Sequence, residues 1–345
     1  MTGGGVVVDG RASILVINVA RIGDTLLVTP AIRALREAFP GGKIGCLLHP
    51  ARVELLRGLP WLDALGTITP KTARWRGRIG GMRWDVALVY GKDAPLIRYA
   101  ARVAERVVAF KQGREELDQL LWRAVEAPGD MHAVHERLLL PQAIGVTTRD
   151  FRLAFFPSEA ERARAAGFMD RNVPATGKRL VAMQTASFPT KSYRDWPIES
   201  FADLGRRILD AYPDAHLILL GGKESRKRAA WLAGQLGPRA TVLAGRMGIR
   251  DTAAVLERVR LYVGVDTGPT HLAGALGIPM VALYHCHHPG RNLVPLGHDR
   301  LRAIEHPATG SRCTRETPMS MIPVEAVWRQ VRSLLDPVGI RGCAP

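Results

Sequence analysis

The feature that most constrains the fold of this chain is an alternation of short apolar segments with amphipathic segments. Short runs of apolar and β-branched residues indicate buried strands, whereas apolar side chains at every third or fourth position indicate helices. In the first half of the chain, strands are expected at residues 13–19, 44–48, 84–90 and 106–110. A helix is expected at 25–39, and the Pro-Gly-Gly sequence that follows ends it. This order predicts a parallel sheet covered by helices.

The same alternation restarts in the second half, after a looser stretch at 145–179. Strands are expected at residues 180–184, 216–220, 241–243, 261–265 and 280–284. Helices are expected at residues 198–212, 224–236, 251–259, 270–276 and 324–335. We therefore predict an α/β protein of two Rossmann-like, doubly wound domains that face one cleft. The domains are expected at 1–170 and 178–322, with a linker at 172–178 and a final helix within 323–336.

Composition excludes several classes of protein. The 345 residues are 47% hydrophobic and 23% charged, which excludes disordered, collagen-like and disulfide-rich chains. No apolar run approaches the roughly 18 residues that a membrane-spanning helix needs, and the first ten residues do not resemble a secretory signal. The four cysteines, Cys46, Cys286, Cys313 and Cys343, form no CxxC pair. We therefore expect free thiols and a cytoplasmic protein.

Positive charge is concentrated in one part of the chain. The formal net charge is +16, and residues 71–114 contain 11 basic and 3 acidic residues, so half of the excess charge lies there. Such blocks face polyanions, which here means nucleic acid, an anionic lipid surface or a phosphorylated substrate. A solvated helical face is the alternative interpretation of the same block.

An aspartate follows the first predicted strand, in the segment Arg21-Ile22-Gly23-Asp24. Open α/β sheets bind ligands beyond the carboxyl ends of their strands, which makes Asp24 a candidate catalytic residue. The alternative is that Asp24 caps the helix that begins there. The segment has one glycine where a dinucleotide-binding fingerprint needs three, so a dehydrogenase is not indicated.

A second candidate site follows the predicted strand 261–265, in the segment Asp266-Thr267-Gly268-Pro269-Thr270-His271. The free amides at the start of a helix form a natural phosphate site, to which Thr267, Thr270 and His271 would add donors. An ordinary capped helix is the alternative interpretation.

A third segment, residues 184–197, offers hydroxyl groups followed by two cations, Lys191 and Arg194, and then Trp196-Pro197. The cations would neutralise a diphosphate leaving group and so lower the barrier of a transfer reaction. A solvated loop is the alternative.

Histidines cluster with a cysteine at residues 285–288. Clustered His and Cys side chains are typical of zinc sites, but this spacing matches no ligand pattern. We therefore expect no metal and place His285 and His287 at the mouth of a cleft. A P-loop is not indicated, because Asn172 and Arg179 occupy two positions at which the P-loop motif requires other residues. The GxSxG and HExxH motifs do not occur either.

Three segments together resemble glycosyltransferase family 9, the heptosyltransferases of the lipopolysaccharide inner core. They are ILVINVARIGDTLLVTPAIRALREAFP, TASFPTKSYRDWPIESFADL and YVGVDTGPTHLAGALGIPMVALY, in colinear order over residues 13–335. The resemblance implies a GT-B fold whose C-terminal helix crosses back to the first domain. It also implies metal-independent, inverting transfer from ADP-heptose, with no cofactor.

The resemblance assigns roles to particular residues. Asp24 falls on the family's general base, and the cation that meets the diphosphate falls on either Lys191 or Arg194, because the family's Lys-x-Trp-Pro is Arg194-Asp195-Trp196-Pro197 here. The donor site is expected to include Thr185, Ser187, Glu224, Asp266, Thr267, Gly268, Thr270 and His271. The segment 285–290 departs from the family pattern and leaves donor or acceptor preference open.

The expected partners are a nucleotide-sugar donor, an anionic lipid-linked saccharide acceptor and the cytoplasmic surface of the inner membrane. Acceptor contacts are expected at Arg21, Arg74, Arg76, Arg78 and Arg83. Nucleic acid is not expected, because the aromatic motif of common RNA-binding domains is missing.

Two other functions remain open from the sequence. One is a GT-B enzyme of different activity, such as a sugar-nucleotide epimerase or a transferase for another polysaccharide. The other is a noncatalytic protein that binds anions or membranes through residues 71–114.

Overall fold

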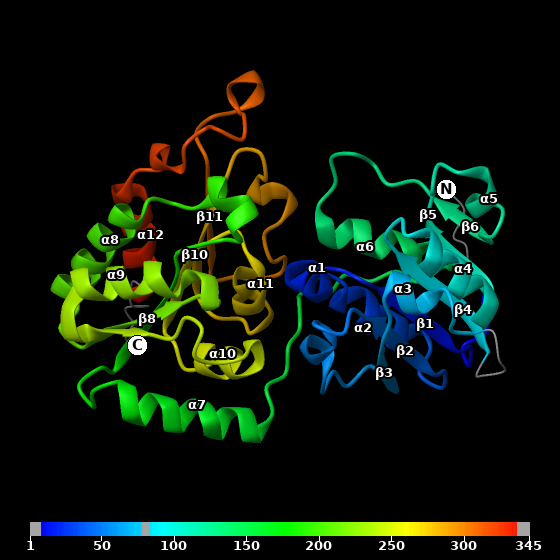
Figure 1. The fold of residues 1–345 in the computed structure, drawn as a ribbon, viewed down its shortest axis with the longest axis horizontal. Helices are drawn as coiled ribbons and strands as arrows, with labels where there is room; N and C mark the ends of the chain where they lie inside the picture. The colour runs from blue at the N-terminus through cyan, green and yellow to red at the C-terminus, as the bar shows by residue number, and fades with distance from the viewer. Residues whose placement is uncertain (1–7, 78–82, 337–345) are drawn as a thin grey trace, which may run out of the picture. The chain divides into compact units, whose positions relative to one another are not determined.

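The computed structural model describes residues 8–77 and 83–336. It divides into two compact units, Met1–Phe156 and Pro157–Pro345 (Figure 1). Each unit contains one six-stranded sheet in which every described strand pair is parallel. Within the described residues, no helix is both long and apolar enough to span a bilayer.

The first unit has a central pair of strands that are buried on both faces. Its strands are β1 (Ile14–Asn18), β2 (Ile44–Leu48), β3 (Ala64–Thr67), β4 (Trp84–Tyr90), β5 (Ala104–Phe110) and β6 (Arg123–Val125), in the order β3-β2-β1-β4-β5-β6. Its helices are α1 (Ile22–Leu27), α2 (Thr29–Ala38), α3 (Pro70–Ala73), α4 (Ala94–Val103), α5 (Glu115–Asp118) and α6 (Ala133–Gln142). All five residues of β1 are buried. Successive side chains of a strand point to opposite faces, so both faces of β1 are covered.

The second unit repeats this architecture. Its strands are β7 (Arg179–Gln184), β8 (Ala215–Leu220), β9 (Ala240–Val242), β10 (Leu261–Val265), β11 (Met280–Tyr284) and β12 (Leu301–Glu305), in the order β12-β11-β10-β7-β8-β9. Its helices are α7 (Glu159–Asn172), α8 (Ile198–Ala211), α9 (Arg226–Leu236), α10 (Ile249–Leu256), α11 (Gly268–Ala275) and α12 (Val324–Leu335). Helix α12 packs on α8, β10 and β11. Its expected return to the first domain stays a prediction.

Every strand expected from the sequence is present, and three more complete the sheets. The additional strands β3, β6 and β12 lie at sheet edges and are partly exposed, so they lack the continuous apolar run that identifies a buried strand. The helix expected at 25–39 is two helices, α1 and α2, which meet at Val28. Pro30 stands in the first turn of α2, where its missing N–H costs nothing.

Helix α7 was not expected, because its sequence is polar and without an apolar stripe. A capping box begins it: the Ser158 hydroxyl accepts from the Glu161 N–H, and the Glu161 carboxylate accepts from the Ser158 N–H. The helix is tied to α10 by the buried Arg250–Glu161 ion pair and by Arg164–Asp251. Residues 173–178 therefore connect α7 to β7 inside the second unit.

The expectation of free thiols is wrong for two of the four cysteines. Cys286 and Cys313 form a disulfide. Strands β11 and β12 are parallel neighbours, so the segments that follow them leave the same edge of the sheet, which brings these two cysteines together. Cys46 is a free, buried cysteine, and burial raises the pKa of its thiol. Cys343 lies outside the described residues.

Candidate active site

Each sheet has one position where the chain reverses the direction in which strands are added. In the first unit this switch point lies between β1 and β4, and in the second it lies between β7 and β10. The loops that leave neighbouring strands there diverge to opposite faces of the sheet and open a crevice at the carboxyl ends. Ligand-binding residues are therefore expected in the loops that follow these four strands.

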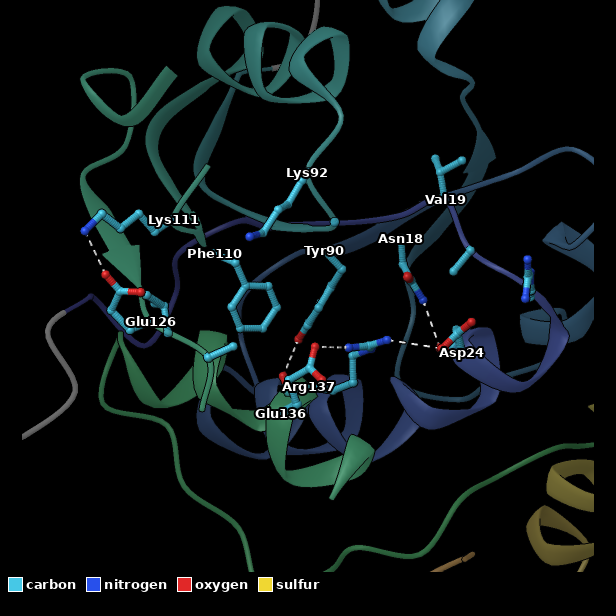
Figure 2. Close-up of a pocket in the computed structure, with 15 residues that line it drawn as sticks. Asn18, Val19, Asp24, Tyr90, Lys92, Phe110, Lys111, Glu126, Glu136 and Arg137 are labelled. Carbon is cyan, nitrogen blue, oxygen red and sulfur yellow. Dashed lines mark hydrogen bonds and ion pairs between the residues drawn. The ribbon is translucent and has the colours of Figure 1, made fainter. Parts of the chain in front are cut away.

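A cavity of about 530 Å³ lies at the switch point of the first unit (Figure 2). It is lined by residues at or just after the carboxyl ends of β1, β4, β5 and β6, by Asp24 of α1 and by residues of α6. Those with polar or charged side chains are Asn18, Arg21, Asp24, Tyr90, Lys92, Lys111, Glu126, Glu136 and Arg137. The cavity thus combines several cations with a few carboxylates.

Asp24 presents its carboxylate to this cavity. Asp24 is the third residue of α1, whose N-cap, Arg21, has no side-chain capping bond. Asp24 therefore does not cap the helix, and that interpretation is wrong. Its Oδ1 lies 3.2 Å from Nη2 of Arg137, and its side chain is 40% exposed. Asn18 Nδ2 donates to the main-chain oxygen of Asp24 at 3.3 Å, which holds the turn against β1.

Arg137 is held by its own neighbours in α6 and β4. Its Nη1 donates to Glu136 Oε1 at 2.6 Å, and the Tyr90 hydroxyl donates to its main-chain oxygen at 2.7 Å. The Arg137 side chain is only 15% exposed. The guanidinium group therefore has few alternative positions and orients the Asp24 carboxylate.

Sequence reasoning missed Lys92, Lys111 and Arg137 as residues of this cavity. Lys92 follows the predicted strand 84–90, and Lys111 follows 106–110 directly, so the rule that selected Asp24 would also have selected them. Lys111 Nζ pairs with Glu126 Oε1 at 2.8 Å, and both side chains are largely exposed. Arg137 carries no such signal, because it stands inside a helix.

The structure divides the expected acceptor residues. Arg21 lines the cavity, whereas Arg74, Arg76 and Arg83 do not. Arg83 precedes β4 and so lies at the amino-terminal edge of the sheet, opposite to the edge that carries Asp24. Arg74 and Arg76 are exposed beyond α3, and Arg76 Nη1 donates to the Thr67 oxygen. Arg78 lies outside the described residues.

A buried ion pair stands at the switch point of the second unit. Arg194, at the end of the 3₁₀-helical segment Pro189–Arg194, places Nη1 2.5 Å from Oδ2 of Asp266, which follows β10. The two side chains are 14% and 5% exposed. His271 Nε2 lies 3.8 Å from the other carboxylate oxygen of Asp266. Asp266 therefore connects the cation loop that follows β7 to the first turn of α11.

The hydroxyl groups at the start of α11 are bonded within the protein. The Thr270 hydroxyl is fully buried, donates to the Val265 oxygen at 2.6 Å and lies 2.9 Å from the Tyr262 hydroxyl. It is therefore not available as the phosphate donor that the sequence predicted. Thr267 is the N-cap of α11, has no side-chain capping bond, and donates its hydroxyl to the same Val265 oxygen at 3.3 Å.

The loop after β7 is shaped by Asp195. Both the amide and the hydroxyl of Ser187 contact Asp195 Oδ1, at 2.7 and 2.6 Å, and burial raises the pKa of this carboxyl. Trp196 is fully buried and donates its indole N–H to the Ile322 oxygen at 2.9 Å. The side chain of Ser187 therefore stabilises the conformation of the loop through its hydrogen bond to Asp195. The fully buried Thr185 Oγ1 has no hydrogen-bond partner in the described chain.

Lys191 and Arg194 differ in their surroundings. Arg194 is neutralised by Asp266, whereas no carboxylate among the described residues pairs with Lys191, whose Nζ lies 5.9 Å from the Tyr193 ring centre. Arg194 Nε is buried and has no partner within the described residues. Glu224 is exposed in the turn that follows β8, at the same edge of the sheet.

The histidines after β11 pack closely without forming a metal site. No group of three or more His, Cys, Asp or Glu side chains in the described parts of the chain is arranged to hold a metal ion. His285 is buried and donates from Nε2 to the Thr317 oxygen at 2.9 Å, while its Nδ1 accepts from the His287 amide. Burial, with a smaller contribution from Arg194, lowers the pKa of His288 to about 4.

Two Rossmann-like units, each with charged residues at its switch point, are the architecture of a GT-B fold. Residues 95–319 match the model of glycosyltransferase family 9 (heptosyltransferase), which is more than half of the chain. The chain therefore belongs to this family and is a glycosyltransferase. The family assignment made from the sequence is confirmed.

Known proteins agree with this assignment. The chain is 22% identical over 283 residues to lipopolysaccharide heptosyltransferase 3 of Escherichia coli, covering 76% of this chain and 80% of the relative. Its fold matches that of a glycosyl transferase family 9 protein from Veillonella parvula with a TM-score of 0.83 at 19% identity, covering 97% and 100% of the two chains. The match to E. coli ADP-heptose lps heptosyltransferase II has a TM-score of 0.74 at 18% identity, covering 94% and 99%. The predicted GT-B fold is confirmed.

Proposed function

We propose that this protein transfers a heptosyl group from ADP-heptose to a saccharide acceptor of the lipopolysaccharide core, with inversion and without a metal ion. The family and the named activities of the two E. coli proteins support the donor and the acceptor. The observation that carries the proposal is the placement of Asp24. It stands at a switch point, in a cavity with several cations, and Arg137 holds one of its carboxylate oxygens.

Asp24 acts as the general base in this proposal. The acceptor hydroxyl oxygen attacks the anomeric carbon of the heptose while the bond from that carbon to the diphosphate oxygen breaks. The hydroxyl proton passes to Asp24 Oδ2, because Oδ1 is bonded to Arg137. A single displacement of this kind inverts the anomeric centre, so one base suffices.

The leaving diphosphate is stabilised by residues of the second unit. Lys191 supplies a positive charge that no described carboxylate compensates, and Arg194 contributes its unpartnered Nε. Helix α11 begins at Gly268, two residues after Asp266, and the free amides of its first turn favour an anion. Fixed cations and dipoles at a developing negative charge lower the barrier without reorganisation during the reaction.

The acceptor enters the cavity of the first unit. Arg21, Lys92 and Lys111 suit an acceptor that carries carboxylate or phosphate groups.

The protein then works at the cytoplasmic face of the inner membrane, where its excess positive charge concentrates it at the anionic lipid surface. Each Lys or Arg near such a surface contributes about 1 kcal/mol.

Nucleotide release from a panel of ADP-, UDP- and GDP-sugars, with and without a defined core acceptor, tests the proposal. We expect ADP release from ADP-heptose that depends on the acceptor, and a loss of about 10²- to 10⁴-fold in kcat for Asp24→Asn. Asp210→Asn, an exposed substitution on α8, is the matched control and should retain activity. Conversion of a donor without acceptor would instead indicate an epimerase, and no nucleotide release from any donor would indicate a noncatalytic anion-binding protein. Near-normal turnover of Asp24→Asn would contradict the assignment of the base.

A further inference from the structure

A side-chain hydrogen bond connects the two loops that flank the carboxyl end of β10. In the second sheet β10 lies between β11 and β7, so the turns after β11 and β7 stand on either side of Asp266. Tyr193 comes from the turn after β7, and His288 comes from the turn after β11. The Tyr193 hydroxyl lies 2.7 Å from His288 Nε2.

Tyr193 belongs to the segment that carries both candidate diphosphate cations. It stands between Lys191 and Arg194, and Lys191 Nζ lies 5.9 Å from its ring centre. Lys191 has non-helical backbone angles, φ −130° and ψ 17°, so it interrupts the 3₁₀-helical segment. The Tyr193 contact with His288 therefore lies within two residues of this interruption.

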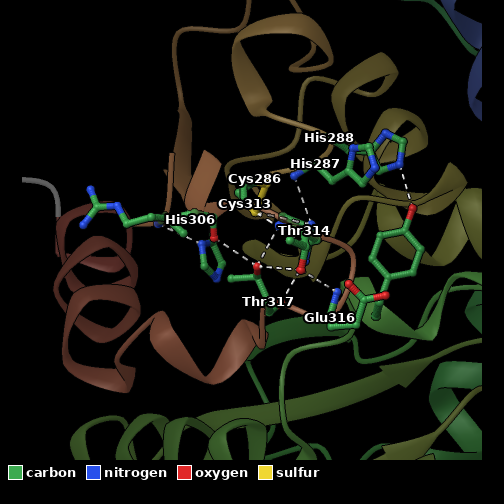
Figure 3. The surroundings of a disulfide bond; sticks show 12 residues. Cys286, His287, His288, His306, Cys313, Thr314, Glu316 and Thr317 are labelled. Carbon is green, nitrogen blue, oxygen red and sulfur yellow. Dashed lines mark hydrogen bonds between the residues drawn. A yellow bond between two sulfur atoms is a disulfide. The ribbon is translucent and has the colours of Figure 1, made fainter. Parts of the chain in front are cut away.

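The partner loop is anchored independently of this contact. Cys286, two residues before His288, is bonded to Cys313 (Figure 3). His285 donates to the Thr317 oxygen. Tyr193 packs edge-on against His285 with ring centres 5.1 Å apart, and His288 stacks on His287. The turn after β11 is therefore held in place by contacts other than the one with Tyr193, and Tyr193 packs against it.

We propose that Tyr193 and His288 form a positioning pair, whose hydrogen bond holds the Lys191–Arg194 segment so that Lys191 meets the donor diphosphate. Neither residue is proposed to touch the reacting atoms. The inference rests on the proposed function, because it takes the donor to be a sugar bound through a nucleoside diphosphate. Burial lowers the pKa of His288 to about 4, so its ring is neutral near pH 7, and the bond between Nε2 and the Tyr193 hydroxyl joins two neutral groups.

Direct binding of ADP, measured by isothermal titration calorimetry on the full-length protein, tests the pair without relying on turnover. We expect Tyr193→Phe and His288→Ala each to raise the ADP Kd and the donor KM about three- to tenfold, as the loss of one hydrogen bond predicts. The acceptor KM should not change. The double variant should be no weaker than either single variant, because both remove the same bond. His288→Gln should recover affinity, since its amide group can either accept from or donate to the Tyr193 hydroxyl.

Tyr99→Phe, in helix α4 of the first unit, is the matched control and should bind ADP like the unmodified protein. Thermal unfolding of each variant separates a loss of fold from a loss of positioning. Unchanged ADP affinity in Tyr193→Phe, or additive losses of ADP affinity in the double variant, would contradict the proposed positioning role of the pair. If ADP binds but no heptosyl transfer occurs, the proposed function fails while the comparison of variants still decides the role of the pair. If the panel identifies another nucleoside diphosphate as product, the same comparison is made with that nucleotide.

Discussion

Arg137 Nη2 lies 3.2 Å from Asp24 Oδ1, and the two residues are 113 positions apart in the chain. The contact joins α6 to the first turn of α1, inside the cavity that we assign to the acceptor. A carboxylate that accepts a proton from a bound hydroxyl group must have a defined orientation. The hydrogen bond from Arg137 fixes the orientation of the Asp24 carboxylate. The contact also leaves Oδ2 as the oxygen that faces the acceptor in the proposed reaction.

Replacement of Arg137 by methionine is expected to lower kcat by about 10- to 100-fold, because a displaced base loses much of its effect. Since Arg137 acts through Asp24, the double variant Asp24→Asn/Arg137→Met should be no slower than Asp24→Asn alone. Steady-state kinetics with saturating donor and acceptor provide the measurement. Arg98→Met, an exposed residue of α4, is the control. Independent, multiplying losses in the double variant would show that Arg137 does not act through Asp24.

The two ends of the first sheet should respond differently to loss of charge. Lys92→Gln is expected to raise the acceptor KM several-fold with the donor KM unchanged, because Lys92 lines the cavity. Lys111→Gln should have a smaller effect, since its ammonium group is already paired with Glu126. Arg83→Gln, at the opposite edge of the sheet, should leave both KM values unchanged. A rise in the acceptor KM for Arg83→Gln equal to that for Lys92→Gln would argue against the cavity as the acceptor site.

The Cys286–Cys313 disulfide is expected to stabilise the second unit. It closes a segment with a sequence separation of 27, so Cys313→Ser should lower the free energy of unfolding by about 2–4 kcal/mol under oxidising conditions. Urea denaturation with and without dithiothreitol provides the measurement. Dithiothreitol should bring the unmodified protein to the stability of the variant and leave the variant unchanged. Two free thiols at these positions in oxidised protein, found by mass spectrometry, would refute the bond.

The buried pair between Glu161 and Arg250 is expected to make stability depend on pH. Both side chains are less than 10% exposed, and hydrogen bonds from Arg250 are the main cause that lowers the pKa of Glu161 to about 2. The folded pKa lies below the unfolded value, so the contribution is present above about pH 4.5 and is lost as the pH falls towards 2.

Glu161→Gln should therefore lower the free energy of unfolding by about 3–5 kcal/mol at pH 7, because it removes the carboxylate charge that pairs with the buried Arg250 guanidinium group. The difference from the unmodified protein should narrow at pH 3, and urea denaturation at the two pH values measures it. Glu159→Gln changes an exposed residue of the same helix and should alter stability by less than about 0.5 kcal/mol. Equal effects of the two substitutions at pH 7 would contradict the argument.

The local sequence was sufficient to predict the central strands and to select candidate site residues in the segments that follow them. The apolar runs of β1, β4, β7 and β10 are buried on both faces and stand out from their surroundings. Asp266 follows such a run directly, and Asp24 lies in the first turn of the helix that comes after one, which is why a sequence pattern could select them. The partly exposed edge strands and the polar helix α7 lack any such contrast, and periodicity did not reveal them.

The sequence by itself determined the α/β class, the central strands and the polar residues at their carboxyl ends, because these follow from the period of apolar side chains along a short stretch of chain. Only the tertiary structure decided which of those residues meet. Asp24 contacts Arg137, Arg194 contacts Asp266, and Cys286 bonds to Cys313. Each pair is created by strand order and helix packing, which depend on the burial of the whole core and leave no mark on the local sequence around either partner.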